Sequence, residues 1–515
     1  MVLIVVDQMR ADYVERYRAD WTAGLKRLVT DGAWFSNAAF PYLGTWTCAG
    51  HATVATGAFP RLHGIFQNQW WDRGARRLVA CTDDAEVTTL RYPTGRGSAA
   101  SGVRLLLPTF ADELRRQRPG ARVGTVALKA RSAIMLAGHG GDAVTWMSES
   151  YEDWETSTAY ARALVPAIAS ILEASPVDAE FGKTWVRRLP EARYTVPDDG
   201  EDEAPPRGWT SRFPHVLNGD DDQRPDRDFR AQWARSPFAD AYVGRFSMAM
   251  TESLRLGGDD DTDFLGVSFS SPDLVGHAFG PHSQEVQDIY AHLDITIGAL
   301  LDRLDALVGR DRYVVALTAD HGVALVPERA AASRNETGRM NTSRIAEAIE
   351  RTAQAAVSGS GPFIARVNSS DVYFTEGTYE KLTKAPAALD AVVAALAAQP
   401  GVARVFRREQ LLGGGSSSDP ALRAAALSYV PRLGGDLVFT VKPGWVYIAA
   451  GTTHGTANPD DQRVPVLVMG PGVRPGEYRE AVTPADIAPT LAALVGISMP
   501  RAEGRALDGA LLAKP

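Results

Sequence analysis

Short apolar runs recur along the chain and alternate with longer segments whose apolar residues follow a helical period. Nearly continuous apolar runs of strand length occur at residues 1–7, 122–134, 263–273, 311–322 and 463–472. Helical patterns occur at residues 238–256, 283–307 and 483–497. Continuous apolar strands are typical of a parallel sheet that is buried on both faces. We therefore predict an α/β fold with a mostly parallel central sheet and helices on both faces.

Two regions interrupt this alternation. Residues 176–235 are rich in proline and acidic residues, which predicts an insertion or cap with much irregular surface. Residues 362–440 contain two strand-like runs on either side of a helical segment, which predicts an inserted β-α-β subdomain. Apart from these insertions, residues 1–515 are predicted to form a single domain.

Composition excludes some classes of function. The net charge is −8, and no basic tract offsets it, so a nucleic-acid partner is not expected. No apolar run reaches the roughly 18 residues of a membrane span, so no membrane partner is expected either. The first strand is predicted to begin at Val2, with no secretory leader before it, so we expect either a cytoplasmic protein or one whose leader is missing from this chain. The two cysteines, Cys48 and Cys81, could form a disulfide or remain thiols.

Acidic and histidine side chains stand where the predicted strands end. Asp7, Asp273 and Asp320 each follow an apolar run, and His321 comes directly after Asp320. His277 lies four residues after Asp273, which places both side chains on one side of a turn or a first helical turn. Ligands collect at the carboxyl ends of parallel strands, so these groups are expected to converge.

A sixth group, His454, lies in a loop before the last strand. Three carboxylates and three imidazoles make a plausible set for two divalent ions, and mixed nitrogen and oxygen ligation suits zinc. One such aspartate alone would be interpreted as a helix cap and one such histidine as structural, but the joint pattern favours a metal site. The other histidines are interpreted as structural: His51, His63, His139, His215, His282 and His292.

Five motifs in this order resemble those of the alkaline phosphatase superfamily: "VVDQMRADY", "TCAGHATVATGAFPRLHGIFQNQW", "SSPDLVGHAFGP", "TADHG" and "THGTANPDDQRVPVLVMGPGV". The match is similar to its nucleotide pyrophosphatase/phosphodiesterase branch. The run "VALKARSAI" points further, to the PafA-type phosphate-irrepressible bacterial alkaline phosphatases. The motifs span most of the chain, so the resemblance implies an alkaline phosphatase-like fold throughout.

The resemblance implies that Thr47 is the nucleophile, because it stands four residues before the histidine of the Gly-His pair. A threonine hydroxyl is a poor nucleophile until metal coordination lowers its pKa. The helix expected just after Thr47 would offer backbone N–H groups to an anion. Cys48 is the rival, but the Cys-x-Pro-x-Arg pattern of sulfatases is missing, so Cys48 is interpreted as structural.

Lys129 and Arg131 are two positions apart on an apolar run, so their side chains are predicted to point the same way from a strand. By itself this pair would be interpreted as two solvated basic side chains on an edge. The resemblance implies instead that the pair holds the transferred phosphoryl group and favours monoesters over diesters. The resemblance also implies that Asn68 donates to a phosphoryl oxygen.

Taken together, the resemblance implies zinc-dependent hydrolysis of small-molecule phosphate monoesters through a phosphothreonine intermediate, in a periplasmic or secreted protein. The alternatives are a phosphodiesterase or nucleotide pyrophosphatase, a metal-dependent phosphomutase, which Thr47 disfavours, and a metal-stabilised binding protein. The oligomeric state is left open. The implied ligands are Asp7, Thr47, Asp320 and His321 for one zinc ion, and Asp273, His277 and His454 for the other.

Overall fold

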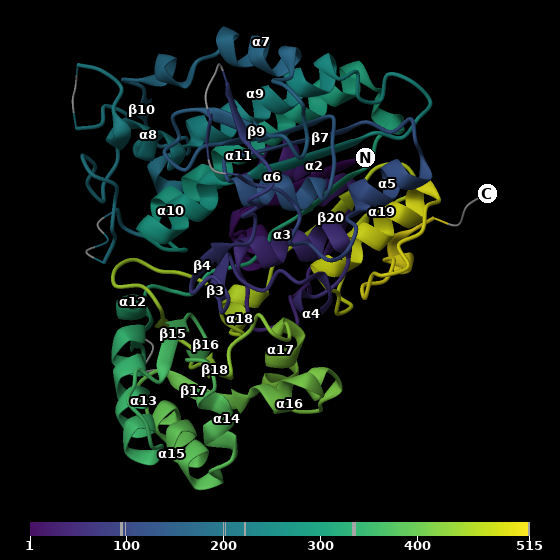
Figure 1. Ribbon diagram of the computed structural model, residues 1–515. Helices are drawn as coiled ribbons and strands as arrows, with labels where there is room; N and C mark the ends of the chain where they lie inside the picture. The colour runs from purple at the N-terminus through teal and green to yellow at the C-terminus, as the bar shows by residue number, and fades with distance from the viewer. Residues whose placement is uncertain are drawn as a thin grey trace.

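The computed structural model describes the chain except residues 93–95, 98, 199, 201, 221–222, 332–335 and 513–515. Within the described residues the main sheet has 11 strands in the order β21-β2-β20-β13-β1-β12-β7-β8-β9-β5-β6 (Figure 1). Its central strands are β13 (Val315–Thr318), β1 (Val2–Val6), β12 (Phe264–Phe269), β7 (Val123–Ala127) and β8 (Ala143–Met147). The outer strands are β21 (Gly476–Tyr478), β2 (Ala33–Phe35), β20 (Val466–Met469), β9 (Trp154–Ser157), β5 (Thr89–Tyr92) and β6 (Arg96–Gly97).

The five central strands run parallel to one another, as the apolar runs predicted. Every residue of these strands is buried, which explains why the sequence shows no alternation there. Strand β20, in contrast, runs antiparallel to β13. The chain between these two strands makes a long excursion through the lower part of the molecule, so no short crossover dictates a parallel return.

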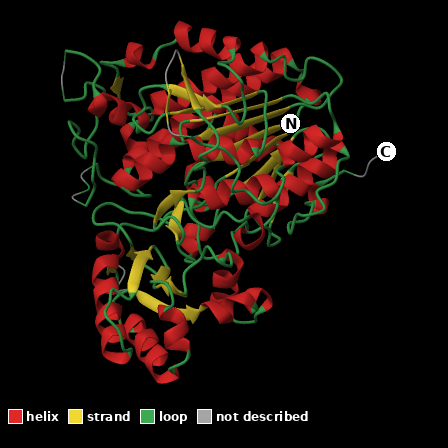
Figure 2. Ribbon diagram, in the orientation of Figure 1, coloured by secondary structure: helices red, strands yellow, loops and turns green. Residues whose placement is uncertain are grey.

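Helices cover both faces of this sheet, which confirms the predicted layers (Figure 2). One group consists of α2 (Gly24–Asp31), α9 (Pro237–Ser253), α10 (Ser271–Phe279) and α11 (Gln284–Leu307). The other consists of α3 (Thr47–Thr56), α5 (Phe110–Gln117), α6 (Ala130–Ala137) and α19 (Ile487–Val495). Polar caps set some of these boundaries: the hydroxyl of Ser283 accepts a hydrogen bond from Val286 N at 3.2 Å, and α11 begins there.

Residues 176–235 contain few regular elements among those described. Apart from two short 3-10 helices, these are β10 (Thr184–Trp185), β11 (His215–Val216) and α8 (Arg227–Ala234). This segment packs against α10 and α11. The indole of Trp185 donates to Asp288 Oδ2 at 2.6 Å, and Ala204 N donates to Ala278 O at 2.7 Å. The acidic segment therefore passes directly beside the end of α10.

The lower part of the molecule is a separate four-stranded antiparallel sheet in the order β15-β16-β18-β17 (Figure 1). Its strands are β15 (Ile364–Asn368), β16 (Asp371–Phe374), β17 (Val402–Arg407) and β18 (Leu437–Val441), and its helices include α13 (Thr342–Ala356), α14 (Thr378–Thr383) and α15 (Pro386–Ala397).

This arrangement differs from the predicted β-α-β unit at residues 362–440. The chain turns at Ser369, which has a φ of 50°, so one predicted strand is in fact the hairpin of β15 and β16. Strand β18 completes the sheet, and the apolar core of this subdomain extends from Met340 to Trp445.

Shorter elements connect these parts: α1 (Asp12–Tyr17), α4 (Pro60–His63), β3 (Gln69–Asp72), β4 (Arg77–Ala80), α7 (Pro166–Ala174), α12 (Pro327–Ala331), β14 (Gly338–Arg339), α16 (Arg408–Leu412), α17 (Pro420–Ser428), β19 (Trp445–Val446) and α18 (Pro459–Gln462). Among the described residues, none of the helices has both the length and the apolar character that crossing a membrane requires.

Candidate active site with two metal-ligand groups

The carboxyl ends of the central strands bring distant acids and histidines together. Asp7 follows β1, Asp320 follows β13 by two residues, and Asp273 lies in the first turn of α10, just after β12. Because these strands are parallel neighbours, their ends meet at one edge of the sheet. The result is two groups whose potential ligand atoms lie within 4.8 Å of one another: Asp7, Asp320 and His321 in the first, and Asp273, His277 and His454 in the second.

Hydrogen bonds to backbone carbonyls fix the tautomers of the three histidines. The Nδ1 atoms of His277, His321 and His454 lie 2.7, 2.9 and 2.8 Å from backbone carbonyl oxygens. A carbonyl oxygen can only accept, so each Nδ1 carries a proton and each Nε2 is the ring atom left to face a metal ion. Such carbonyl partners are common behind metal-bound histidines, because they orient the ring and raise its basicity.

The first group also contains carboxylate oxygens that lack hydrogen-bond partners. Asp7 Oδ1 and Asp320 Oδ2 are buried and make no hydrogen bond among the described residues. They lie 3.5 and 3.3 Å from His321 Nε2. Buried oxygens of this kind are costly unless a cation or donor satisfies them. The residues present therefore fit a divalent cation at this group.

The electrostatics of the two groups differ. Burial, together with the charges of Asp273 and Asp320, raises the pKa of Asp7 well above its usual value. Burial alone would raise the pKa of Asp273 too, but His277 and Lys129 beside it hold that pKa well below the usual value. Burial and the neighbouring ring of His321 lower the pKa of His454 well below its ordinary range, which keeps this imidazole neutral and suited to ligation.

Lys129 lies between the two groups. Its Nζ donates to Asp7 Oδ2 at 2.6 Å and to Asp273 Oδ2 at 2.5 Å, one carboxylate from each group. Burial lowers the pKa of this ammonium group, but the two carboxylates outweigh burial and raise it above the usual value. Lys129 therefore places a fixed positive charge at the centre of the site.

The predicted strand geometry of Lys129 and Arg131 was wrong. Strand β7 ends at Ala127, Lys129 is the residue before α6, and Arg131 lies in the first turn of that helix. Their side chains are thus not two outward positions of one strand. Arg131 is half-buried, and its Nε is buried without a hydrogen-bond partner among the described residues. An unpartnered guanidinium nitrogen of this kind can receive an anion.

Thr47 is the first residue of α3 and is buried. Its Oγ1 lies 3.3 Å from His321 Nε2, so the hydroxyl adjoins the first ligand group. Gly50 permits this approach, because a Cβ at position 50 would come within 2.0 Å of Asp320 O. The glycine of the Gly-His pair thus lets α3 pack directly against the end of β13.

His51, which sequence analysis interpreted as structural, also contacts a potential metal ligand. Its Nδ1 donates to Thr47 O at 2.9 Å and lies 3.2 Å from Asp320 Oδ2, while its Nε2 lies 2.9 Å from Ser268 Oγ. His51 therefore ties the turn that carries Thr47 to β12 and to Asp320. Only its place in the Gly-His pair could have drawn attention to it.

Asn68 is linked to α3 through its side-chain oxygen Oδ1, which accepts a hydrogen bond from Cys48 N at 2.9 Å. This bond leaves the amide nitrogen of Asn68 as a donor. The Cys48 side chain forms a disulfide with Cys81. The structure thus decides the question of pairing that the sequence left open, and Cys48 is not a free thiol.

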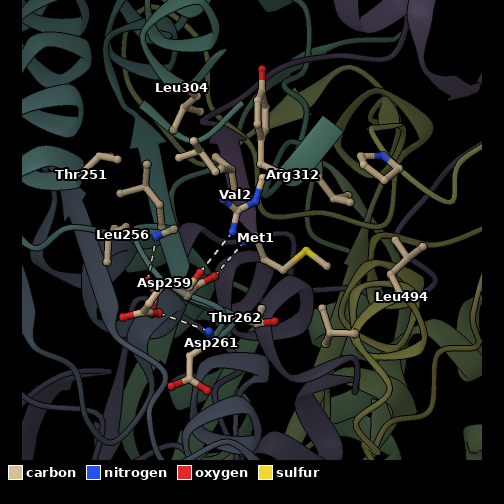
Figure 3. Close-up of a pocket in the computed structure, with 18 of the residues that line it drawn as sticks. Met1, Val2, Thr251, Leu256, Asp259, Asp261, Thr262, Leu304, Arg312 and Leu494 are labelled. Atoms are coloured by element: carbon tan, nitrogen blue, oxygen red, sulfur yellow. Dashed lines mark hydrogen bonds between the residues drawn. The ribbon is translucent and has the colours of Figure 1, made fainter. Parts of the chain in front are cut away.

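A cavity of about 280 Å³ lies elsewhere, at the amino-terminal edge of the same sheet (Figure 3). Its lining includes Asp259, Asp261, Thr262 and Arg312, and none of the predicted site residues. The Asp259 carboxylate is paired with the guanidinium of Arg122, 2.5 Å away. This acidic cavity is separate from the two ligand groups.

Residues 1–461 match the family described as type I phosphodiesterase / nucleotide pyrophosphatase. The chain belongs to this family. It is 30% identical to the alkaline phosphatase PhoV of Synechococcus elongatus over 97% of this chain and 90% of PhoV. It is also 30% identical to the alkaline phosphatase PafA of Elizabethkingia meningoseptica, over 97% of this chain and 92% of PafA. The predicted family, fold and enzyme class are therefore confirmed.

The crystal structure of wild-type PafA superposes on this fold with a TM-score of 0.88 at 28% identity, covering 99% of this chain and 98% of PafA. A solved PafA variant carries substitutions at a threonine, an asparagine, a lysine and an arginine. The first two of these are separated in sequence as Thr47 and Asn68 are, and the last two as Lys129 and Arg131 are.

Proposed function

We propose that this protein is a zinc-dependent phosphomonoesterase that hydrolyses small phosphate esters through phosphorylation of Thr47. The observation that carries the proposal is the position of the Thr47 hydroxyl, which lies 3.3 Å from His321 Nε2 at the edge of two groups of metal ligands. The family and its alkaline phosphatase members support the class of reaction.

Two zinc ions fit the donor set. Each group offers carboxylate oxygen and imidazole nitrogen, a mixture that suits zinc better than magnesium or calcium. Asp7, Asp320 and His321, together with Thr47, would hold one ion, and Asp273, His277 and His454 the other. Bound zinc would supply positive charge that lowers the pKa of the nucleophilic hydroxyl and offsets charge on the oxygens of the ester.

The chain's own residues would then carry out two displacements. The Thr47 hydroxyl loses its proton and its Oγ1 bonds to phosphorus, the bond from phosphorus to the ester oxygen breaks, and that oxygen leaves with the electron pair and takes up a proton to become the alcohol. Water next attacks the phosphothreonine, releasing phosphate and restoring the hydroxyl of Thr47. Arg131, with its unpartnered Nε, and the free amide nitrogen of Asn68 bind the non-bridging oxygens throughout.

The positive charges favour monoesters over diesters. A monoester dianion presents three charged oxygens, whereas a diester replaces one of them with a bulky neutral substituent. Lys129 lies between the two ligand groups and Arg131 lies in the first turn of the helix that follows it, so a second ester group would occupy the space of an oxygen that these charges attract. The family also contains diesterases and pyrophosphatases, which makes this preference the point to test.

The decisive experiment combines metal analysis with a rate comparison. The purified chain should contain about two zinc ions, lose activity in excess chelator and regain it with zinc. Its kcat/KM for an aryl phosphate should exceed that for a bis-aryl phosphate by several orders of magnitude. Full activity in chelator would refute the zinc assignment, and a preference for the diester would identify a phosphodiesterase instead.

We further propose a periplasmic or secreted location. The disulfide between Cys48 and Cys81 supports it, because such bonds persist in oxidising compartments. A fractionation experiment with an antibody against the chain would check this, and recovery in the cytoplasm with both thiols reduced would contradict it.

A further inference from the structure

Gln8 lies between the two ligand groups and contacts one carboxylate of each. Its backbone N–H donates to Asp320 Oδ1 at 3.1 Å, and its side-chain Nε2 donates to Asp273 Oδ1 at 2.6 Å. The residue is 2% exposed, and its φ is 69°, in the left-handed region that non-glycine residues rarely adopt. Asp7, a ligand of the first group, precedes it directly.

The unusual backbone conformation gives Gln8 these two contacts at once. Backbone strain of this kind persists only where the surroundings maintain it, and it is concentrated at functional sites. Gly276 on α10 provides the space, because a Cβ at that position would come within 1.8 Å of Gln8 Oε1. The side chain of Gln8 thus packs against the same helix that carries Asp273 and His277.

We infer that Gln8 is a positioning residue that holds Asp273 and Asp320 in the orientations required to bind the two metal ions, an inference that rests on the proposed function. Asp273 Oδ1 accepts from Gln8 while facing His277 Nε2 at 3.1 Å, and Oδ2 accepts from Lys129. Without the amide, the carboxylate of Asp273 would lose one of the two donors that set its rotation. Removing a residue that hydrogen-bonds to a metal ligand typically weakens metal binding by about 10- to 100-fold.

The test is a zinc titration of the full-length metal-free chain against a competing chromophoric chelator, which resolves the affinities of the two sites. Two variants remove the amide in different ways: Gln8→Gly relieves the left-handed backbone, and Gln8→Met retains both that backbone and the side-chain volume. Both should weaken one of the two zinc sites by about 10- to 100-fold and leave the other nearly unchanged. Excess zinc should restore most of the activity in each variant.

A third variant disturbs the contact between Gln8 and Asp273 from α10 instead of from Gln8. Gly276→Ala changes no metal ligand, but its methyl group must push the Gln8 amide away from Asp273. It should weaken the same zinc site, and it should have little further effect in a Gln8→Gly background. Such non-additivity identifies a shared contact rather than two independent disturbances of the fold. Arg255→Gly, at a left-handed residue (φ 54°) that follows α9, is the control for backbone relief and should leave both affinities unchanged.

The possible results separate the two proposals. A native chain that binds no zinc would overturn both the zinc assignment and the role of Gln8. A native chain that binds two zinc ions, with unchanged affinities in Gln8→Gly, Gln8→Met and Gly276→Ala, would overturn only the role of Gln8. A selective loss at one site that added zinc reverses would support both.

Discussion

The carboxyl-terminal ends of the central strands (the carboxyl edge of the sheet) and their amino-terminal ends (the amino edge) both carry several carboxylates. The two differ in almost every other respect. At the carboxyl edge, Asp7 and Asp320 are fully buried and face His321. At the amino edge, Asp259 and Asp261 are exposed around the cavity of Figure 3, whose described lining includes no histidine. The run of acids at 259–263 is the denser of the two in sequence, but it builds no comparable site.

The comparison teaches that burial and neighbours, rather than the number of acids, make the site. An exposed carboxylate is hydrated and is screened by salt, so its charge has little influence on a ligand. A buried carboxylate without a partner is costly and therefore strongly attracts a cation. The amino edge also satisfies its one buried acid internally, because Asp263 accepts N–H groups from Arg122 and Gly257, each at 2.7 Å.

Removing a hydroxyl at each edge should give the largest contrast. Thr47→Ala should abolish the phosphoenzyme and lower kcat by about 10⁴-fold or more, because it removes the proposed nucleophile. The matched Thr262→Ala, in the lining of the amino-edge cavity, should leave kcat within about twofold. Trapping with labelled substrate at low pH and rapid-quench kinetics would measure both. A phosphoenzyme that survives in Thr47→Ala would show that another residue is the nucleophile.

Neutralising one carboxylate at each edge tests the role of burial directly. Asp273→Asn should reduce zinc content by about one ion per chain and reduce activity by about 10³-fold, since it removes a charged ligand of the second group. Asp260→Asn, the same change at an exposed residue, should alter neither quantity. Elemental analysis and steady-state rates would check both variants, and equal losses would remove the distinction between the two edges.

Removing one guanidinium at each edge should have a smaller effect. Arg131→Ala should cost about 2–4 kcal/mol of transition-state stabilisation, roughly 30- to 1000-fold in kcat/KM, with a greater loss for monoesters than for diesters. Arg312→Ala at the amino edge should stay near the native rate, because Arg312 is exposed and its side chain bonds only to the backbone of Asp259 among the described hydrogen bonds. Equal losses on the two classes of ester would argue against Arg131 as the source of specificity.

Zinc should also stabilise the native chain against unfolding, and this is the smallest of the expected effects. At a free zinc concentration 100 times the dissociation constant, one site adds about 2.7 kcal/mol to the free energy of unfolding. Thermal unfolding with and without zinc would measure the rise in Tm, which should shrink in Asp273→Asn and persist in Asp260→Asn. An identical rise in both would place the stabilising ion away from the second ligand group.

Much of the fold could be predicted from the sequence because the pattern is local. Continuous apolar runs such as residues 1–7 and 263–273 report burial on both faces, and the acids after them follow from where parallel strands end. The lower subdomain was harder: its strands pair antiparallel with half-exposed edges, and residues 363–374 were interpreted as one strand, although the polar residues from Asn368 to Asp371 mark the turn of a hairpin.

Several features of the site lay beyond sequence reasoning. Two positions of separation suit a strand, so Lys129 and Arg131 were placed on β7, although the strand ends at Ala127 and a helix begins between them. His51 and Gln8 look ordinary in sequence, because their importance comes from atoms more than 200 positions away, in Ser268, Asp273 and Asp320.

The sequence by itself determined which residue types stand at the strand ends and, through the order of its motifs, the family. Only the tertiary structure decided which nitrogen of each histidine faces the site, which carboxylate oxygens lack partners, and that Lys129 links the two groups. The reason is physical. Apolar periodicity is written into neighbouring residues, whereas a hydrogen bond or an ion pair depends on the position and direction of single atoms, and these are set only when segments hundreds of residues apart pack together.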